Sequence, residues 1–166
     1  MKRTSRFELL VAAIVVLAAV ALAEDPAAVT ALKGRTTAPT EVSFDHSVTL
    51  AALLAKPGAN DWSVEKAATI EGYVIQVVQS DDGDYRLSLA TKPGETDTKT
   101  WVIVEATPAW QTKEPSLAAA KLADRSLIGN KVRATGWLFF DETTVAFPRG
   151  TNWEIHPLTS LVVLAK

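Results

Sequence analysis

The sequence contains no cysteine and only two histidines, His46 and His156, among its 166 residues. Without cysteine the chain forms no disulfide, has no thiolate to offer a metal, and lacks the attachment site of a lipoprotein. Transition-metal sites usually combine several histidine or cysteine ligands at patterned spacing. The composition therefore predicts no metal centre and no cofactor, and a protein that is stabilised by packing alone.

Long hydrophobic runs are also absent, except at the start of the chain. Leu9 to Ala23 is uncharged, and Ala21-Leu22-Ala23 gives a small-x-small pattern before Glu24. The basic residues that precede this run are Lys2, Arg3 and Arg6. This is the pattern of a signal peptide over residues 1–23, with cleavage near Ala23 and export to the periplasm or medium. The alternative is an uncleaved anchor, although the run is shorter than the roughly 20 residues that span a bilayer.

The mature chain has no excess of positive charge. Removing residues 1–23 leaves 14 basic residues against 18 acidic ones, a formal net charge of −4. Nucleic-acid-binding proteins usually carry a basic patch or stripe. The charge therefore disfavours nucleic acid as a partner, and after signal cleavage no stable membrane span is expected.

What remains divides into three segments. Residues 24–43 are rich in Ala, Thr and Pro without a clear period, which predicts a flexible linker. Residues 44–60 contain a short helix from Ser47 to Ala55, capped by Asp45 or Ser47, and a connection that begins at Pro57. Residues 61–166 form the main domain.

The main domain alternates between strand and turn patterns. Asp81-Asp82-Gly83-Asp84 is a strong hairpin signal. Gly72 and Gly136 lie inside strands, where a glycine indicates a bulge or tight bend. One helix is predicted from Pro115 to Leu127, and the five strands are predicted over Ala67–Gln79, Tyr85–Thr91, Thr100–Ala106, Lys131–Asp141 and Asn152–Leu164.

This order, β-β-β-α-β-β, predicts an all-β domain with one helix: a five-stranded OB-fold barrel preceded by a short helix. Closing the sheet also removes its exposed edges. The alternative is an open antiparallel sheet with the helix on one face.

The domain from Asp61 to Leu164 resembles a family of bacterial exported OB-fold proteins. The matching segments are IEGYV (70–74), VIVEATP (102–108), VRATGWLFFD (132–141) and WEIHP (153–157). The resemblance implies the fold and export, and no particular reaction. Relatives in that family carry cysteine and histidine between the first two strands, where this chain has Asp81, Asp82 and Asp84.

Glu154 and His156 raise the question of an active site. They are two residues apart in a strand and therefore share a face, opposite Trp153 and Ile155. A carboxylate next to an imidazole favours the charged imidazole and makes a pH-sensitive pair. The favoured interpretation is that Trp153 and Ile155 fill the core while Glu154 and His156 lie on the outer surface.

Glu105 is the other notable carboxylate, because it ends an otherwise apolar strand. It is either exposed at the rim of the barrel or paired with Arg86, Arg133 or Arg149. The favoured interpretation is an ion pair or backbone contact that fixes the end of the barrel, and the alternative is a polar group at the mouth of a binding groove.

The favoured function is an exported, non-catalytic binding module for an envelope protein, peptide, glycan or cation. By analogy with other OB-folds, the contacts are expected on the second and third strands. The candidate binding residues are Tyr85, Arg86, Trp101, Glu105, Glu154 and His156. The alternatives are a single-stranded nucleic-acid-binding protein and a small hydrolase that uses Glu105 or the Glu154–His156 pair.

Overall fold

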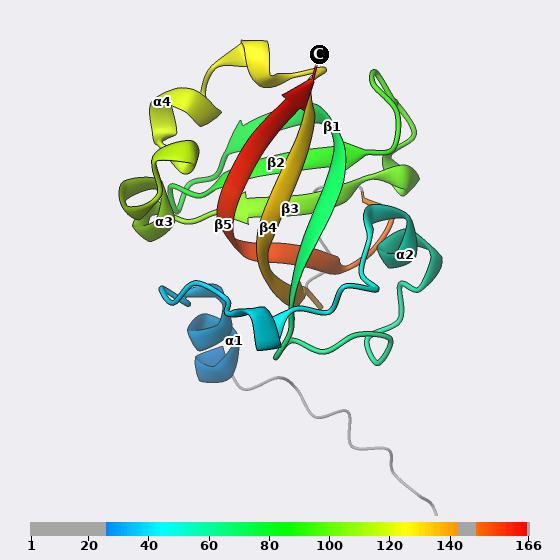
Figure 1. The fold of residues 1–166 in the computed structure, drawn as a ribbon, viewed down its shortest axis with the longest axis vertical. Coiled ribbons are helices and arrows are strands. Elements are labelled where there is room, and N and C mark those ends of the chain that lie inside the picture. The colour runs from blue at the N-terminus through cyan, green and yellow to red at the C-terminus, as the bar shows by residue number, and fades with distance from the viewer. Residues whose placement is uncertain (1–25, 143–148, 166) are drawn as a thin grey trace, which may run out of the picture.

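The computed structural model describes residues 26–142 and 149–165 and arranges five strands in a closed barrel (Figure 1). Around the barrel the order is β1-β2-β3-β5-β4; β3 and β5 are parallel, and the other neighbours are antiparallel. The strands are β1 (Ala67–Gln79), β2 (Tyr85–Ala90), β3 (Val102–Ala106), β4 (Lys131–Phe140) and β5 (Trp153–Ala165). The predicted OB-fold barrel is confirmed. The predicted signal peptide lies outside the described residues.

Alternation along the strands fills the barrel with apolar side chains. β5 sends Trp153 and Ile155 inward, and both are fully buried. β3 contributes Val102 and Val104 to the same core. The odd-numbered residues of β3 and the even-numbered residues at the start of β5 therefore point to the outside of the barrel.

Two strand glycines, Gly72 in β1 and Gly136 in β4, allow close contacts that a side chain would block. At Gly136, where the β4–β5 register shifts, a Cβ atom would lie 2.3 Å from the carbonyl oxygen of Pro157, so only glycine fits. At Gly72 a Cβ would lie 2.6 Å from a methyl group of Leu50, and the irregularity in β1 falls later, between Val74 and Gln76. Gly136 thus marks a bend as predicted, whereas Gly72 makes room for the neighbouring helix.

That helix, α2 (Leu50–Ala55), begins three residues later than predicted. The hydroxyl of Thr49 caps it by accepting from the backbone N–H of Ala52 at 3.1 Å. Asp45 instead accepts from the N–H of Ser47. The cap predicted at Asp45 or Ser47 was therefore wrong.

The single helix predicted from Pro115 to Leu127 was also wrong. Glu114 and Ala118 are extended, and they separate short helical pieces. Pro115 explains the first break, because a proline disfavours helical backbone in the residue before it. Within the predicted range the pieces are a 3₁₀ turn (Pro115–Leu117), α4 (Ala119–Leu122) and a second 3₁₀ turn (Arg125–Leu127). They are preceded by a helix that was not predicted, α3 (Pro108–Lys113).

The segment predicted as a flexible linker is instead docked on the barrel. It forms helix α1 (Pro26–Lys33), followed by an extended strap, residues 35–37. The indole N–H of Trp110 donates to the carbonyl of Arg35 at 2.7 Å, and that of Trp137 donates to the carbonyl of Thr37 at 2.9 Å. The strap thereby fixes α1 against the end of the barrel (Figure 1). Within the two described ranges, no helix is long and apolar enough to cross a membrane.

Candidate functional site

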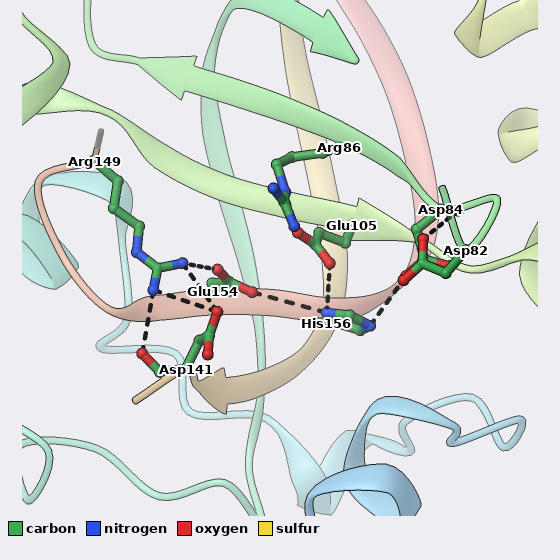
Figure 2. A network of polar contacts seen from close by, with 8 residues as sticks. All are labelled: Asp82, Asp84, Arg86, Glu105, Asp141, Arg149, Glu154 and His156. Carbon is green, nitrogen blue, oxygen red and sulfur yellow. Dashed lines mark hydrogen bonds and ion pairs between the residues drawn. The ribbon is translucent and has the colours of Figure 1, made fainter. Parts of the chain in front are cut away.

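Four of the six predicted binding residues meet on the outside of the barrel. Arg86 of β2 lies opposite Glu105 of β3, and β5 brings Glu154 and His156 alongside. They are joined by three residues that the sequence analysis did not select, Asp84, Asp141 and Arg149. These seven residues, here called the charged cluster, are drawn in Figure 2 with Asp82.

The other two predicted residues lie elsewhere. Tyr85 is only 8 % exposed and belongs to the hydrophobic core, so its ring is not presented to a ligand. Trp101 is half-buried at the opposite end of β3 from the hairpin that contains Asp84, and its carbonyl accepts from the N–H of Gly150 at 2.9 Å. The prediction that Tyr85 lies on the exposed face was therefore wrong.

The charged cluster is buried, in contrast to the exposed position predicted for Glu154 and His156. Their side chains are 1 % and 2 % exposed, and that of Glu105 is 4 % exposed. The ring of Phe139 packs edge-on against the imidazole, with centroids 5.8 Å apart. On its other side Phe139 meets the ammonium of Lys33, at the end of α1, 5.0 Å from the ring centroid.

His156 is at the centre of the cluster (Figure 2). Its Nδ1 lies 2.9 Å from Oε2 of Glu105 and 3.8 Å from Oε2 of Glu154, and its Nε2 lies 3.5 Å from Oδ2 of Asp84. These are ion-pair distances, but none has the geometry of a hydrogen bond. Within the described part of the chain, both ring nitrogens and Oε2 of Glu154 lack a hydrogen-bond partner.

Two arginines hold the carboxylates from their other sides. Arg86 donates to Oε1 of Glu105. Arg149 donates to Oε1 of Glu154 and, at 3.1 Å, to the carbonyl of Asp141. Each glutamate thus gives one oxygen to an arginine and turns the other toward His156.

The surroundings shift the pKa of His156 and Glu105 in opposite directions. Burial lowers the pKa of His156, but Glu105 and Glu154 outweigh it and raise that pKa to about 9. Burial raises the pKa of Glu105, but His156 and Arg86 outweigh it and lower that pKa to about 2. At neutral pH the pair is therefore an imidazolium beside a carboxylate.

The remaining carboxylates respond mainly to burial. Burial raises the pKa of Asp84 to about 6, against the attraction of His156. Burial also raises the pKa of Glu154, opposed by His156 and Arg149. Asp84 and Glu154 therefore take up protons at higher pH than ordinary carboxyl groups do.

Sequence reasoning found some of these contacts and missed others. Arg86 was among the partners expected for Glu105, whereas Arg133 pairs with Glu71 and Arg149 with Glu154. Asp84 was interpreted as part of a solvated turn, yet it is buried and its carboxylate faces His156. The only sequence signal for the burial of Asp84 was that the apolar strand β3 ends next to the hairpin.

The arrangement has two chemical capacities. An imidazole between carboxylates can carry a proton, and Asp84, Glu105 and His156 offer donor atoms within 4.8 Å of one another, close enough to hold one metal ion. His46, by contrast, is exposed, lies 3.1 Å from Glu41 and stacks on the ring of Phe44. The cluster is thus the candidate functional site.

Comparison with known proteins adds little to this description. The sequence matches no protein-family model and no curated protein. Among solved structures, the chain is similar to Entamoeba histolytica asparaginyl-tRNA synthetase (14 % identity, TM-score 0.43), covering 65 % of this chain and 22 % of that one. It is also similar to OBody AM3L09 bound to hen egg-white lysozyme (17 % identity, TM-score 0.47), covering 68 % of this chain and 92 % of that one. The chain thus spans about a fifth of the synthetase, and such low similarities say nothing about its ligand.

Replacing Arg149 with Met is expected to destabilise the protein by about 3–5 kcal/mol, because it leaves Glu154 buried without its cation. The matched control is Arg133→Met, which breaks an exposed pair with Glu71 and is expected to cost less than about 1 kcal/mol. Urea unfolding of both variants measures the difference. Equal losses would show that burial of the cluster does not determine its energetics.

The stability of the metal-free protein is expected to fall between about pH 6.5 and 9. Below pH 6.5 His156 is protonated in both the folded and unfolded states, and its ion pairs contribute fully. As pH rises toward 9 the unfolded state loses its proton first, so about 3 kcal/mol of stability is lost.

Urea unfolding across this range, with a chelator present, measures the slope. His156→Gln should flatten it, whereas His46→Gln, which alters an exposed histidine, should leave it unchanged. A slope that persists in His156→Gln would assign the titration to another group.

Proposed function

We propose that this protein is an exported, non-catalytic binding module that holds a basic segment of an envelope protein at the exposed ends of the face formed by β2, β3 and β5. The observation that carries the proposal is the convergence of the charged cluster on this face, between the β1–β2 hairpin and Arg149, which precedes β5. OB-folds use this face and these loops to bind extended ligands. Fold alone does not identify a ligand, so the class of ligand is inferred from the charged residues of this face.

The charges of the face favour a basic ligand. The cluster contains four carboxylates, Asp84, Glu105, Asp141 and Glu154, against three cationic groups, Arg86, Arg149 and His156. Asp81 and Asp82 add two exposed carboxylates at the tip of the hairpin. An extended peptide that runs from this acidic tip toward Trp101 fits the polarity, whereas a phosphate backbone does not.

The nucleic-acid alternative is weakened by the position of its stacking residue. Single strands bind OB-folds through aromatic rings exposed in a basic groove. Tyr85 lies in the core, and Arg86 already pairs with Glu105. Two of the three groove residues on which that hypothesis relied are therefore engaged within the protein, and the third, Trp101, is half-buried.

The hydrolase alternative has one observation in its favour. Glu105 and His156, on different strands, lie 2.9 Å apart, as a shared active site would require. Catalytic groups must also reach the substrate, and here both side chains are at most 4 % exposed. Binding at the exposed ends of the face remains the better account.

The proposed ligand class can be tested by titrating the protein with a lysine-rich peptide, a glutamate-rich peptide and a single-stranded oligonucleotide, each at two salt concentrations. We expect only the basic peptide to change tryptophan fluorescence, and more salt to weaken that binding. Asp81→Asn/Asp82→Asn should bind about tenfold more weakly, since two surface pairs of about 0.7 kcal/mol each are lost.

Glu41→Gln is the matched control, because it neutralises an exposed carboxylate that contacts His46 on another part of the surface. Trp101→Ala tests the other end of the face. If the oligonucleotide binds and the basic peptide does not, the order of the hypotheses is reversed. If no probe binds, the proposed ligand class is wrong.

Export is tested separately. When the gene is expressed in a bacterium, the protein recovered from the periplasm or medium should begin at Glu24, as read by N-terminal sequencing. Recovery of a chain that begins at Met1 in the membrane fraction would instead support the retained anchor. Recovery in the cytoplasm would contradict export.

A further inference from the structure

We propose that Asp84, Glu105 and His156 form a site for one divalent transition-metal ion. Their donor atoms lie within 4.8 Å of one another, and all three residues are buried. They come from three places in the chain: the hairpin before β2, the end of β3, and β5. The sequence predicts no metal site because its ligand pattern is scattered and contains a single histidine.

The state of His156 is the second, independent observation. Its side chain is 2 % exposed, and neither ring nitrogen makes a hydrogen bond within the described part of the chain. A buried polar atom without a partner usually costs about 1–3 kcal/mol, so each such atom in a folded protein needs an explanation. Here the two nitrogens face carboxylates, Nε2 toward Asp84 and Nδ1 toward Glu105. A metal ion bound to one nitrogen would give that nitrogen a coordinate bond in place of its ion pair.

The donor set selects the class of ion. An imidazole nitrogen with two carboxylate oxygens suits zinc and its first-row neighbours. Calcium takes six to eight oxygen ligands, and this site supplies one nitrogen and two carboxylates. Zinc is therefore the probe of choice.

The residues around the three ligands orient them. Arg86 occupies Oε1 of Glu105 and leaves Oε2 directed at the imidazole. Glu154, whose Oε1 is held by Arg149, places Oε2 3.8 Å from Nδ1 of His156. Both glutamates therefore approach the same ring nitrogen, while Asp84 approaches the other.

The charge balance of the cluster points the same way. With a protonated imidazole the cluster has four negative groups against three positive ones. A divalent ion on a neutral imidazole replaces one positive charge by two, and the buried cluster becomes neutral. Since uncompensated buried charge is costly, the ion improves the electrostatics of the site.

Access is from the side of the hairpin. Asp84 has the most exposed side chain of the three, at 10 %, compared with 4 % for Glu105 and 2 % for His156. An ion that arrives along the acidic hairpin meets Asp84 first. The site does not require a protein partner, so it stands whether or not the proposed peptide binding is correct.

The direct test is to strip the full-length protein with a chelator, return Zn²⁺, and follow the two histidine rings by ¹⁵N NMR. We expect one ion per chain by isothermal titration calorimetry, a shift of the His156 ring nitrogens, and unchanged His46 signals. This measurement uses the unaltered protein and cannot be confused with a folding defect.

Variants then test the ligands. Asp84→Asn and His156→Gln should each weaken Zn²⁺ binding by more than about 100-fold, with tryptophan fluorescence confirming that each variant is folded. His46→Gln is the control, since it removes the other histidine, which also pairs with a carboxylate. If no ion is taken up, if His46 responds instead of His156, or if binding survives both ligand variants, the site does not exist.

Discussion

Closure of the barrel depends on one junction, which the contact between His156 and Glu105 spans. It joins β5 to β3, and these strands share only two aligned residue pairs, Ile103 with Glu154 and Val104 with Ile155. Inside the barrel, Trp153 and Ile155 hold the same junction by packing. The shortest seam of the barrel is thus secured by an apolar contact on one side and a charged contact on the other.

A buried charged contact of this kind is not an efficient way to gain stability. Removing ions from water costs several kcal/mol per ion, and apolar replacements are often as stable. The charges of the cluster nevertheless compensate one another, because each glutamate contacts an arginine with one oxygen and faces His156 with the other. Packing alone does not require these polar groups, and a role in binding, as proposed above, would account for them.

Local patterns predicted the barrel well. The Asp-Gly hairpin, the alternation of the strands and the bend at Gly136 all follow from contacts a few residues apart or from the sterics of one position. Alternation also showed that Glu154 and His156 share a face. It did not show that this face is covered, because burial depends on segments distant in the sequence, including the helix α1 in a stretch interpreted as a linker. Tyr85 was misplaced for a related reason: which side of β2 is inward was taken from fold analogy.

The strap at residues 35–37 has a consequence for the order of events in folding. Its carbonyls accept from Trp110 and Trp137, which lie 75 and 100 residues further along the chain. A ribosome makes this segment long before either indole exists. The segment that is synthesised first therefore docks only after α3 and β4 have formed, so it is among the last parts of the domain to reach its final position.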